Sequence, residues 1–111
     1  MKLSSIVTLL LAATLVLFAQ DAMPRMSTAE PTNGKAGDVI AVTGENLDKA
    51  NVDKVYLTDG KNDVVCAVTE QTATSIKIKI PDKATGRMAL MILTAGKEPK
   101  LIEQPVKLTI E

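Results

Sequence analysis

Three glycines and a lysine lie close together in PTNGKAGDVIAVTGENL (residues 31–47), a composition that could bind a phosphate. A phosphate-binding loop of the Walker type needs a Lys followed directly by Ser or Thr, and then a helix whose amides face the phosphate. Here Ala follows the lysine, and the next residues are typical of a strand. The glycines also lack the spacing of the dinucleotide-binding fingerprint. We therefore interpret them as turn residues at the two ends of a strand: Gly34, Gly37 and Gly44.

Residues for nucleophilic or metal-dependent catalysis are scarce. The chain has no His, which removes the base of Ser-His and Cys-His schemes and the commonest transition-metal ligand. The single cysteine, Cys66, lies in an apolar run, and we interpret it as a buried small hydrophobe, with an intermolecular disulfide as the alternative. Carboxylates that could cleave a glycoside fall on predicted loops, where aspartate usually forms turns: Asp48, Asp53, Asp59, Asp63 and Asp82. We expect no enzymatic activity and no cofactor.

Calcium is a second chemistry that loop carboxylates could serve. The segments NLDKANVD and DGKND carry seven oxygen donors: Asn46, Asp48, Asn51, Asp53, Asp59, Asn62 and Asp63. Neither segment has the spacing of an EF-hand loop, and Lys61 occupies a position where a ligand would be needed. We predict that these residues form turns and that there is no metal site, with calcium binding as the alternative.

The charge balance excludes several classes of partner. The chain has 13 Lys and Arg residues and 13 Asp and Glu residues, which gives a net charge of +0. A nucleic-acid-binding surface needs an excess of basic residues to neutralise phosphates. Acidic and basic residues also alternate along the chain instead of forming blocks. We expect no nucleic-acid partner and no polybasic membrane patch.

The N-terminus has the features of a secretory signal peptide. Lys2 precedes an apolar stretch over residues 6–18, and Ala19 is a small residue at the expected cleavage point. The stretch is shorter than the roughly 20 residues of a spanning helix, so a retained anchor is the alternative and stable membrane insertion after cleavage is not expected. We predict a signal peptide over residues 1–19, a lead-in over 20–30, a domain over 31–111, and a secreted or periplasmic location.

The remainder of the chain reads as short strands separated by turns. SIKIKIP alternates Ile with Lys, and similar runs are DVIAVTG, KVYLTDG, DVVCAVT, RMALMILT and PVKLTI. Alternation with a period of two indicates strands that are buried on one face. No stretch has convincing helical periodicity. The predicted fold is an all-β, immunoglobulin-like antiparallel β-sandwich of about seven strands.

The order of these motifs resembles the IPT/TIG domain. The resemblance starts from a Pro, two glycines, an Asp, an apolar strand and Gly-x-Asn-Leu, and continues through VYL, SIKIKIPDKATGRMALMI and PVKLTI. It covers about residues 24–111. It implies an immunoglobulin-like fold that usually serves as a binding or spacing module, and it implies no conserved catalytic site. Such domains usually belong to larger chains.

One strand predicts an apolar outward face. If Met88, Leu90 and Ile92 point inward, alternation turns the residues between them outward, where they would meet apolar residues of neighbouring strands. A contiguous apolar surface often marks an interaction site, and Met adapts well to a partner. The alternative is that a loop covers this face or that the strand is buried on both sides. The candidate binding residues are Tyr56, Val65, Ala67, Ala89, Met91 and Leu93.

These features favour a secreted, non-catalytic binding module with a protein partner or a second copy of itself. The alternative is an accessory carbohydrate-binding module at the cell envelope or outside the cell. Sugar-binding platforms generally use Trp or Tyr rings, and Tyr56 is the one such ring in the predicted mature chain. The sequence therefore favours the protein partner and keeps the carbohydrate as the second hypothesis.

Overall fold

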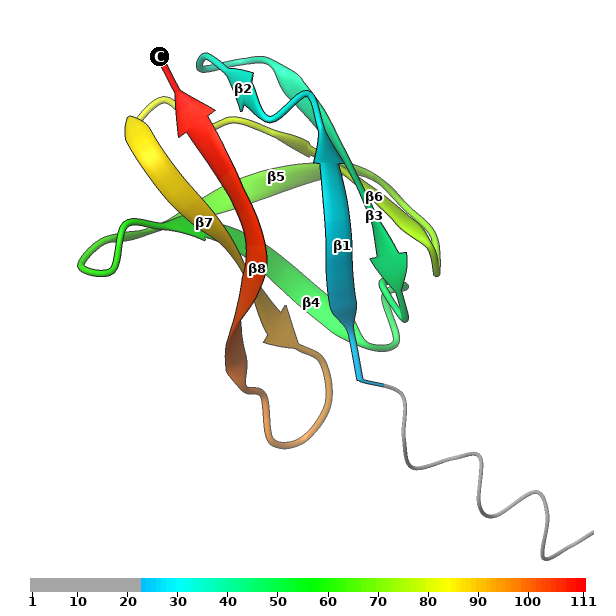
Figure 1. Cartoon of the computed structure of the whole chain (residues 1–111). Coiled ribbons are helices and arrows are strands. Elements are labelled where there is room, and N and C mark those ends of the chain that lie inside the picture. The colour runs from blue at the N-terminus through cyan, green and yellow to red at the C-terminus, as the bar shows by residue number, and fades with distance from the viewer. Residues whose placement is uncertain (1–22) are drawn as a thin grey trace, which may run out of the picture.

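The computed structural model describes residues 23–111, and the predicted signal peptide lies outside this range. Eight strands form in the described part of the chain (Figure 1). Their bounds are β1 (Arg25–Glu30), β2 (Asn33–Gly34), β3 (Val39–Glu45), β4 (Val52–Thr58), β5 (Asp63–Gln71), β6 (Ser75–Lys79), β7 (Gly86–Thr94) and β8 (Leu101–Ile110). Among these residues no helix is long and apolar enough to cross a membrane.

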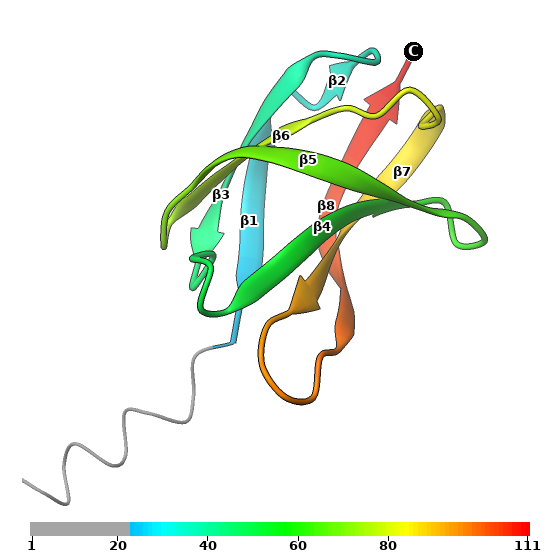
Figure 2. The ribbon, with the colours of Figure 1, turned by 180° about the vertical axis from the view of Figure 1, so that it is seen from behind.

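The strands fold into two packed layers that share β5 (Figures 1 and 2). The hydrogen-bonded order is β1-β3-β6-β5-β4-β7-β8-β2, antiparallel except for the short β2–β8 pair. The first half of β5, through Cys66, pairs with β4, and the second half, from Ala67, pairs with β6. We call β1-β3-β6 with the second half of β5 the first sheet, and the other strands the second sheet. The predicted immunoglobulin-like sandwich is confirmed, with eight strands instead of about seven.

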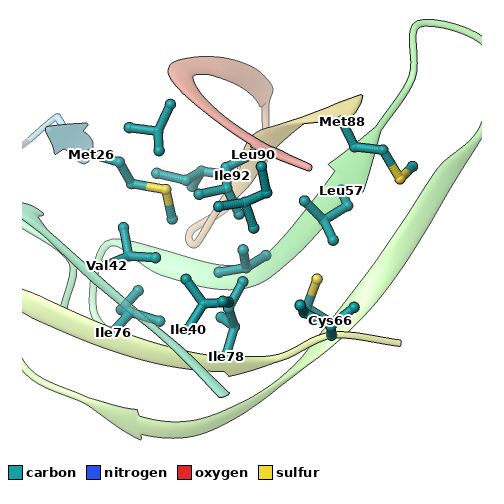
Figure 3. Packing of buried hydrophobic residues seen from close by; sticks show 14 of the residues in the cluster. Met26, Ile40, Val42, Leu57, Cys66, Ile76, Ile78, Met88, Leu90 and Ile92 are labelled. Atoms are coloured by element: carbon teal, nitrogen blue, oxygen red, sulfur yellow. The ribbon is translucent and has the colours of Figure 1, made fainter. Parts of the chain in front are cut away.

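The core lies between the two sheets and follows the predicted alternation (Figure 3). Each fully buried Leu or Ile side chain stabilises the fold by about 1.5–3 kcal/mol relative to an exposed one. The apolar residues that recur with this period in the predicted strands belong to this cluster and are at most 3% exposed: Ile40, Val42, Val55, Leu57, Ile76, Ile78, Ile80, Met88, Leu90 and Ile92. The period-two pattern therefore identified the packed face of four strands correctly, β3, β4, β6 and β7.

The first strand corrects the expected start of the domain. Residues 25–30, placed in a lead-in by the sequence, form β1, which pairs with β3 and buries Met26 completely. The sandwich therefore begins before Pro31. The strand was not predicted because Met26 is its only large apolar residue and its other five residues are polar or small.

The glycines of the opening stretch have different roles. Gly37 has a φ of 92°, in the left-handed region, and forms the turn before β3 as expected. Gly44 lies inside β3 and opposite Met26 on β1, and a Cβ atom built on it would lie 2.9 Å from the Met26 Cα. Asn46, with a φ of 55°, turns the chain after the strand. The expectation that Gly44 bends the chain is therefore wrong: it permits a close approach of two backbones.

The Gln104 side chain on β8 joins the two sheets where β8 lies beside β1. The pairing of β7 with β8 shifts register between Ala89 and Met91, where β8 contains Gln104 and Pro105. Gln104 is 4% exposed, and its Oε1 accepts a hydrogen bond of 2.7 Å from the Met26 backbone N–H. Its Nε2 donates to the carbonyl of Ile102 at 3.3 Å. Both polar ends of this buried side chain are therefore satisfied within the sandwich.

Candidate functional site

The outward surface of the second sheet brings together most of the predicted binding residues. Tyr56 on β4 lies opposite Val65 on β5 and opposite Met91 on β7, and Met91 lies opposite Glu103 on β8. Their neighbours Val55, Cys66 and Ile92 are core residues, so alternation points this row away from the core. We call the outward surface of β5, β4, β7 and β8 the outer face.

Burial on the outer face decreases from its centre to its edges. Met91 and Ala89 are only 8% and 7% exposed, yet neither belongs to the core cluster. They lie on β7, which has a paired strand on each side. Tyr56 and Leu93 are half-buried, whereas Val65 at the β5 edge is 51% exposed. An apolar band therefore crosses the face and reaches solvent at its edge.

Ala67 lies apart from this band. At Ala67, β5 changes partner from β4 to β6, so the residue sits where the strand leaves the second sheet. Ala67 and Val65 line one side of an open groove of about 520 Å³, and Gly37 and Pro81 line it as well. Five of the six predicted residues thus share the outer face, and the sixth lies at its border.

The sequence missed one exposed apolar residue of the outer face. Leu101 on β8 is 54% exposed and lies opposite Leu93. We began the last strand at Pro105, since proline is uncommon inside strands. The strand instead begins at Leu101 and includes the proline at its irregular register. The apolar pair Leu101 and Ile102 before the proline was the signal that could have identified it.

The candidate calcium segments form turns through their own hydrogen bonds. The Asp59 Oδ1 accepts bonds from the backbone N–H groups of Lys61 at 2.8 Å and Asn62 at 2.7 Å, and these bonds hold the pKa of the Asp59 carboxyl below its usual value. Asp48 accepts a bond from the Asn51 side chain at 2.9 Å. Within residues 23–111, no three His, Cys, Asp or Glu side chains are grouped so as to hold a metal ion.

Cys66 is a core residue. It is 4% exposed, and burial raises the pKa of its thiol from 9.0 to about 12. The interpretation as a buried small hydrophobe is therefore confirmed. A thiol in this environment remains protonated at neutral pH, and almost none of its surface is accessible to a second molecule.

We expect the Cys66 thiol to resist alkylation in the folded protein, because the thiolate is the reactive species. The increase in pKa alone predicts alkylation about a thousandfold slower at pH 8 than after unfolding in denaturant. The check is the rate of iodoacetamide labelling, followed by mass spectrometry, with and without denaturant. Equal labelling rates would contradict the buried position of Cys66 and would favour the alternative of an intermolecular disulfide.

The fold and the face define the class of this protein. Two packed antiparallel sheets around one apolar core are the architecture of an immunoglobulin-like domain. The chain belongs to the IPT/TIG domain family, whose model matches residues 24–110. The resemblance that the sequence motifs indicated is therefore confirmed. The family match begins one residue before β1, in agreement with the observed start of the sandwich.

Three solved structures that are similar to this chain come from Bacteroides species. A structural genomics protein of unknown function from Bacteroides thetaiotaomicron is 20% identical with a TM-score of 0.69, over 83% of this chain and 22% of that one. An auxiliary nutrient binding protein from Bacteroides ovatus is 22% identical with a TM-score of 0.57, over 80% of this chain and 21% of that one.

A third similar structure is SGBP-B of the Bacteroides ovatus mixed-linkage glucan utilization locus, in complex with a mixed-linkage heptasaccharide. It is 20% identical with a TM-score of 0.52, over 76% of this chain and 22% of that one. This chain thus spans about a fifth of the length of each of these three proteins. At these identities the likeness shows the fold alone. No relative is found among the curated proteins.

Proposed function

We propose that this chain is a non-catalytic immunoglobulin-like module that binds another protein through the outer face. The observation that carries the proposal is the continuous apolar band from exposed Val65, over Tyr56 and Met91, to Leu93 and exposed Leu101. Solvent-exposed aliphatic side chains that continue a buried apolar surface are typical of protein interfaces.

The proposal includes the absence of catalysis and a location outside the cytoplasm. The chain has no His, and the loop aspartates Asp48 and Asp59 are engaged in turn hydrogen bonds. The apolar N-terminal stretch has the pattern of a secretory signal peptide. One similar structure is an auxiliary nutrient binding protein from Bacteroides ovatus, which supports an envelope or extracellular location.

Carbohydrate binding is the second candidate. The observation that favours it is the half-buried Tyr56 ring, which lies on the outer face and could stack on a sugar. A similar structure holds a heptasaccharide, within a chain of which this fold is about a fifth. Tyr56 is the only tyrosine and the chain has no Trp, so a platform of several rings cannot form.

The proposal is tested by placing a charge on the outer face. We expect Val65→Asp and Leu101→Asp each to reduce capture of protein partners from envelope and secreted extracts about tenfold, because a carboxylate in an apolar interface must be desolvated. The matched control is Val39→Asp on β3 of the first sheet, which is 48% exposed and should leave capture unchanged. Melting temperatures of all three variants establish that they remain folded.

Two outcomes would contradict the protein-binding proposal. If Val39→Asp lowers capture as much as the other two variants, the effect does not come from the outer face. If a panel of polysaccharides binds the protein and Tyr56→Ala abolishes that binding, the carbohydrate candidate replaces it.

A further inference from the structure

The two edges of the outer face carry opposite charges in one row. Asp63 on β5 lies opposite Thr58, Thr58 lies opposite Ala89, and Ala89 lies opposite Lys107 on β8. Asp63 and Lys107 are both exposed. Three strand spacings of about 4.8 Å separate them, so they cannot pair within one molecule. Within residues 23–111 the only ion pair joins Lys77 to Glu70, on the first sheet.

We infer that two copies of this chain bind each other face to face through the outer face. This inference rests on the proposed function and names the partner. The twofold axis runs parallel to the strands, midway between β4 and β7. Because such an axis preserves the rows but reverses the strand order, β5 of one copy lies over β8 of the other. Asp63 of each copy then meets Lys107 of the second copy, which forms two identical ion pairs.

The same rotation matches the apolar residues at the centre and places Val65 of one copy over Glu103 of the other at the exposed edge of the face. Tyr56 of one copy lies over Met91 of the other, a sulfur–aromatic contact that is favourable in itself. Thr58 lies over Ala89, whose small side chain leaves room for it. Packed sheets usually cross at about 30°. At this angle the side chains of facing rows in the two copies still lie close enough to contact each other. Each of these contacts occurs twice in the pair.

The charges also distinguish this arrangement from the other face-to-face arrangement. A twofold axis perpendicular to the strands would place β8 over β8. Glu103, in the central row, would then lie against Glu103 of the second copy. Like charges brought together at an interface cost free energy, so this orientation is disfavoured. The axis parallel to the strands removes that contact and adds the two pairs between Asp63 and Lys107.

The size of the face sets the strength of the association. Four strands at the usual spacing and three rows of side chains cover about 400 Å² in each copy, half the area of a standard interface. A net charge of +0 adds no long-range repulsion between copies. We therefore expect a weak, reversible dimer with a Kd on the order of 0.1–1 mM, the range of transient contacts.

The test is sedimentation velocity of the purified protein up to about 1 mM, the top of the expected Kd range. The wild type should associate as concentration rises. Asp63→Lys and Lys107→Asp should each weaken association about tenfold, because both edge pairs become repulsive. An equimolar mixture of the two variants should recover association, since each introduced charge then faces its opposite. Lys79→Asp, an exposed β6 variant on the first sheet, is the charge-matched control and should behave like the wild type.

A wild type that stays monomeric at every concentration would overturn this inference and leave the capture experiment of the proposed function unaffected. The arrangement would also be overturned if both charge-reversal variants associated as strongly as the wild type, or if their equimolar mixture did not recover association. Recovery in the mixture, with both single variants weakened, supports it, because pairing between β5 of one copy and β8 of the other predicts that pattern.

Discussion

Gly44→Ala is expected to destabilise the fold by about 3 kcal/mol, which is at the upper end of the usual cost of overpacking. The added Cβ would lie 2.9 Å from the Met26 Cα and 3.0 Å from the Arg25 carbonyl carbon. These are backbone atoms of β1, so no side chain can rotate away to make room. The strand must shift as a whole, which would disturb its pairing with β3. Denaturant unfolding followed by circular dichroism measures the loss.

Gly60→Ala is the control for Gly44→Ala, because it adds backbone strain without adding a steric clash. Gly60 has a φ of 95° and no atom within 4 Å of a built Cβ, so its substitution carries only conformational strain, about 1–2 kcal/mol. We expect Gly44→Ala to cost more. If Gly44→Ala is as stable as Gly60→Ala, the close approach of β1 and β3 does not require glycine.

Replacing Gln104 with leucine is expected to cost about 2 kcal/mol. Leucine has a similar volume but removes the acceptor of the 2.7 Å bond from the Met26 N–H, which would remain buried without a partner. An unsatisfied buried donor costs about 1–3 kcal/mol, more than the net value of an ordinary hydrogen bond. The free energy of unfolding in denaturant is the measurement.

The neighbouring residue supplies the control for Gln104. Glu103 precedes it on β8 and is exposed, so Glu103→Leu should change the free energy of unfolding by less than about 0.5 kcal/mol. Amide hydrogen exchange gives a second measurement, since the Met26 N–H should lose its protection in Gln104→Leu before the other β1 amides do. An unchanged unfolding midpoint in Gln104→Leu would show that the bond adds nothing to stability.

Strands with strong alternation could be predicted from the sequence. SIKIKI alternates over six residues, and its three Ile residues are at most 2% exposed. The outward direction of Met91 and Leu93 followed from the same period, because one register decides both faces of a strand. Local pattern was sufficient wherever a strand has several apolar residues on one face.

Features that depend on contacts between distant parts of the chain could not be predicted from the sequence. β1 has one large apolar residue, and its identity as a strand comes from pairing with β3, so the domain start was misplaced. Gln104 looks like any polar strand residue, and only the approach of β1 shows why it is buried. Leu101 was missed because Pro105 looked like a strand boundary, whereas the register shift accommodates it.

The described chain enters and leaves the sandwich at opposite ends (Figures 1 and 2). β1 and β8 run in the same direction, one from each sheet. A force that pulls on the two ends therefore acts along both strands. It loads the bond between Met26 and Gln104 in shear, together with the bonds from Thr109 N–H to the Thr32 carbonyl and from Glu111 N–H to the Gly34 carbonyl. Bonds that share a load fail together, so the domain should resist tension along its length better than a pull across its sheets.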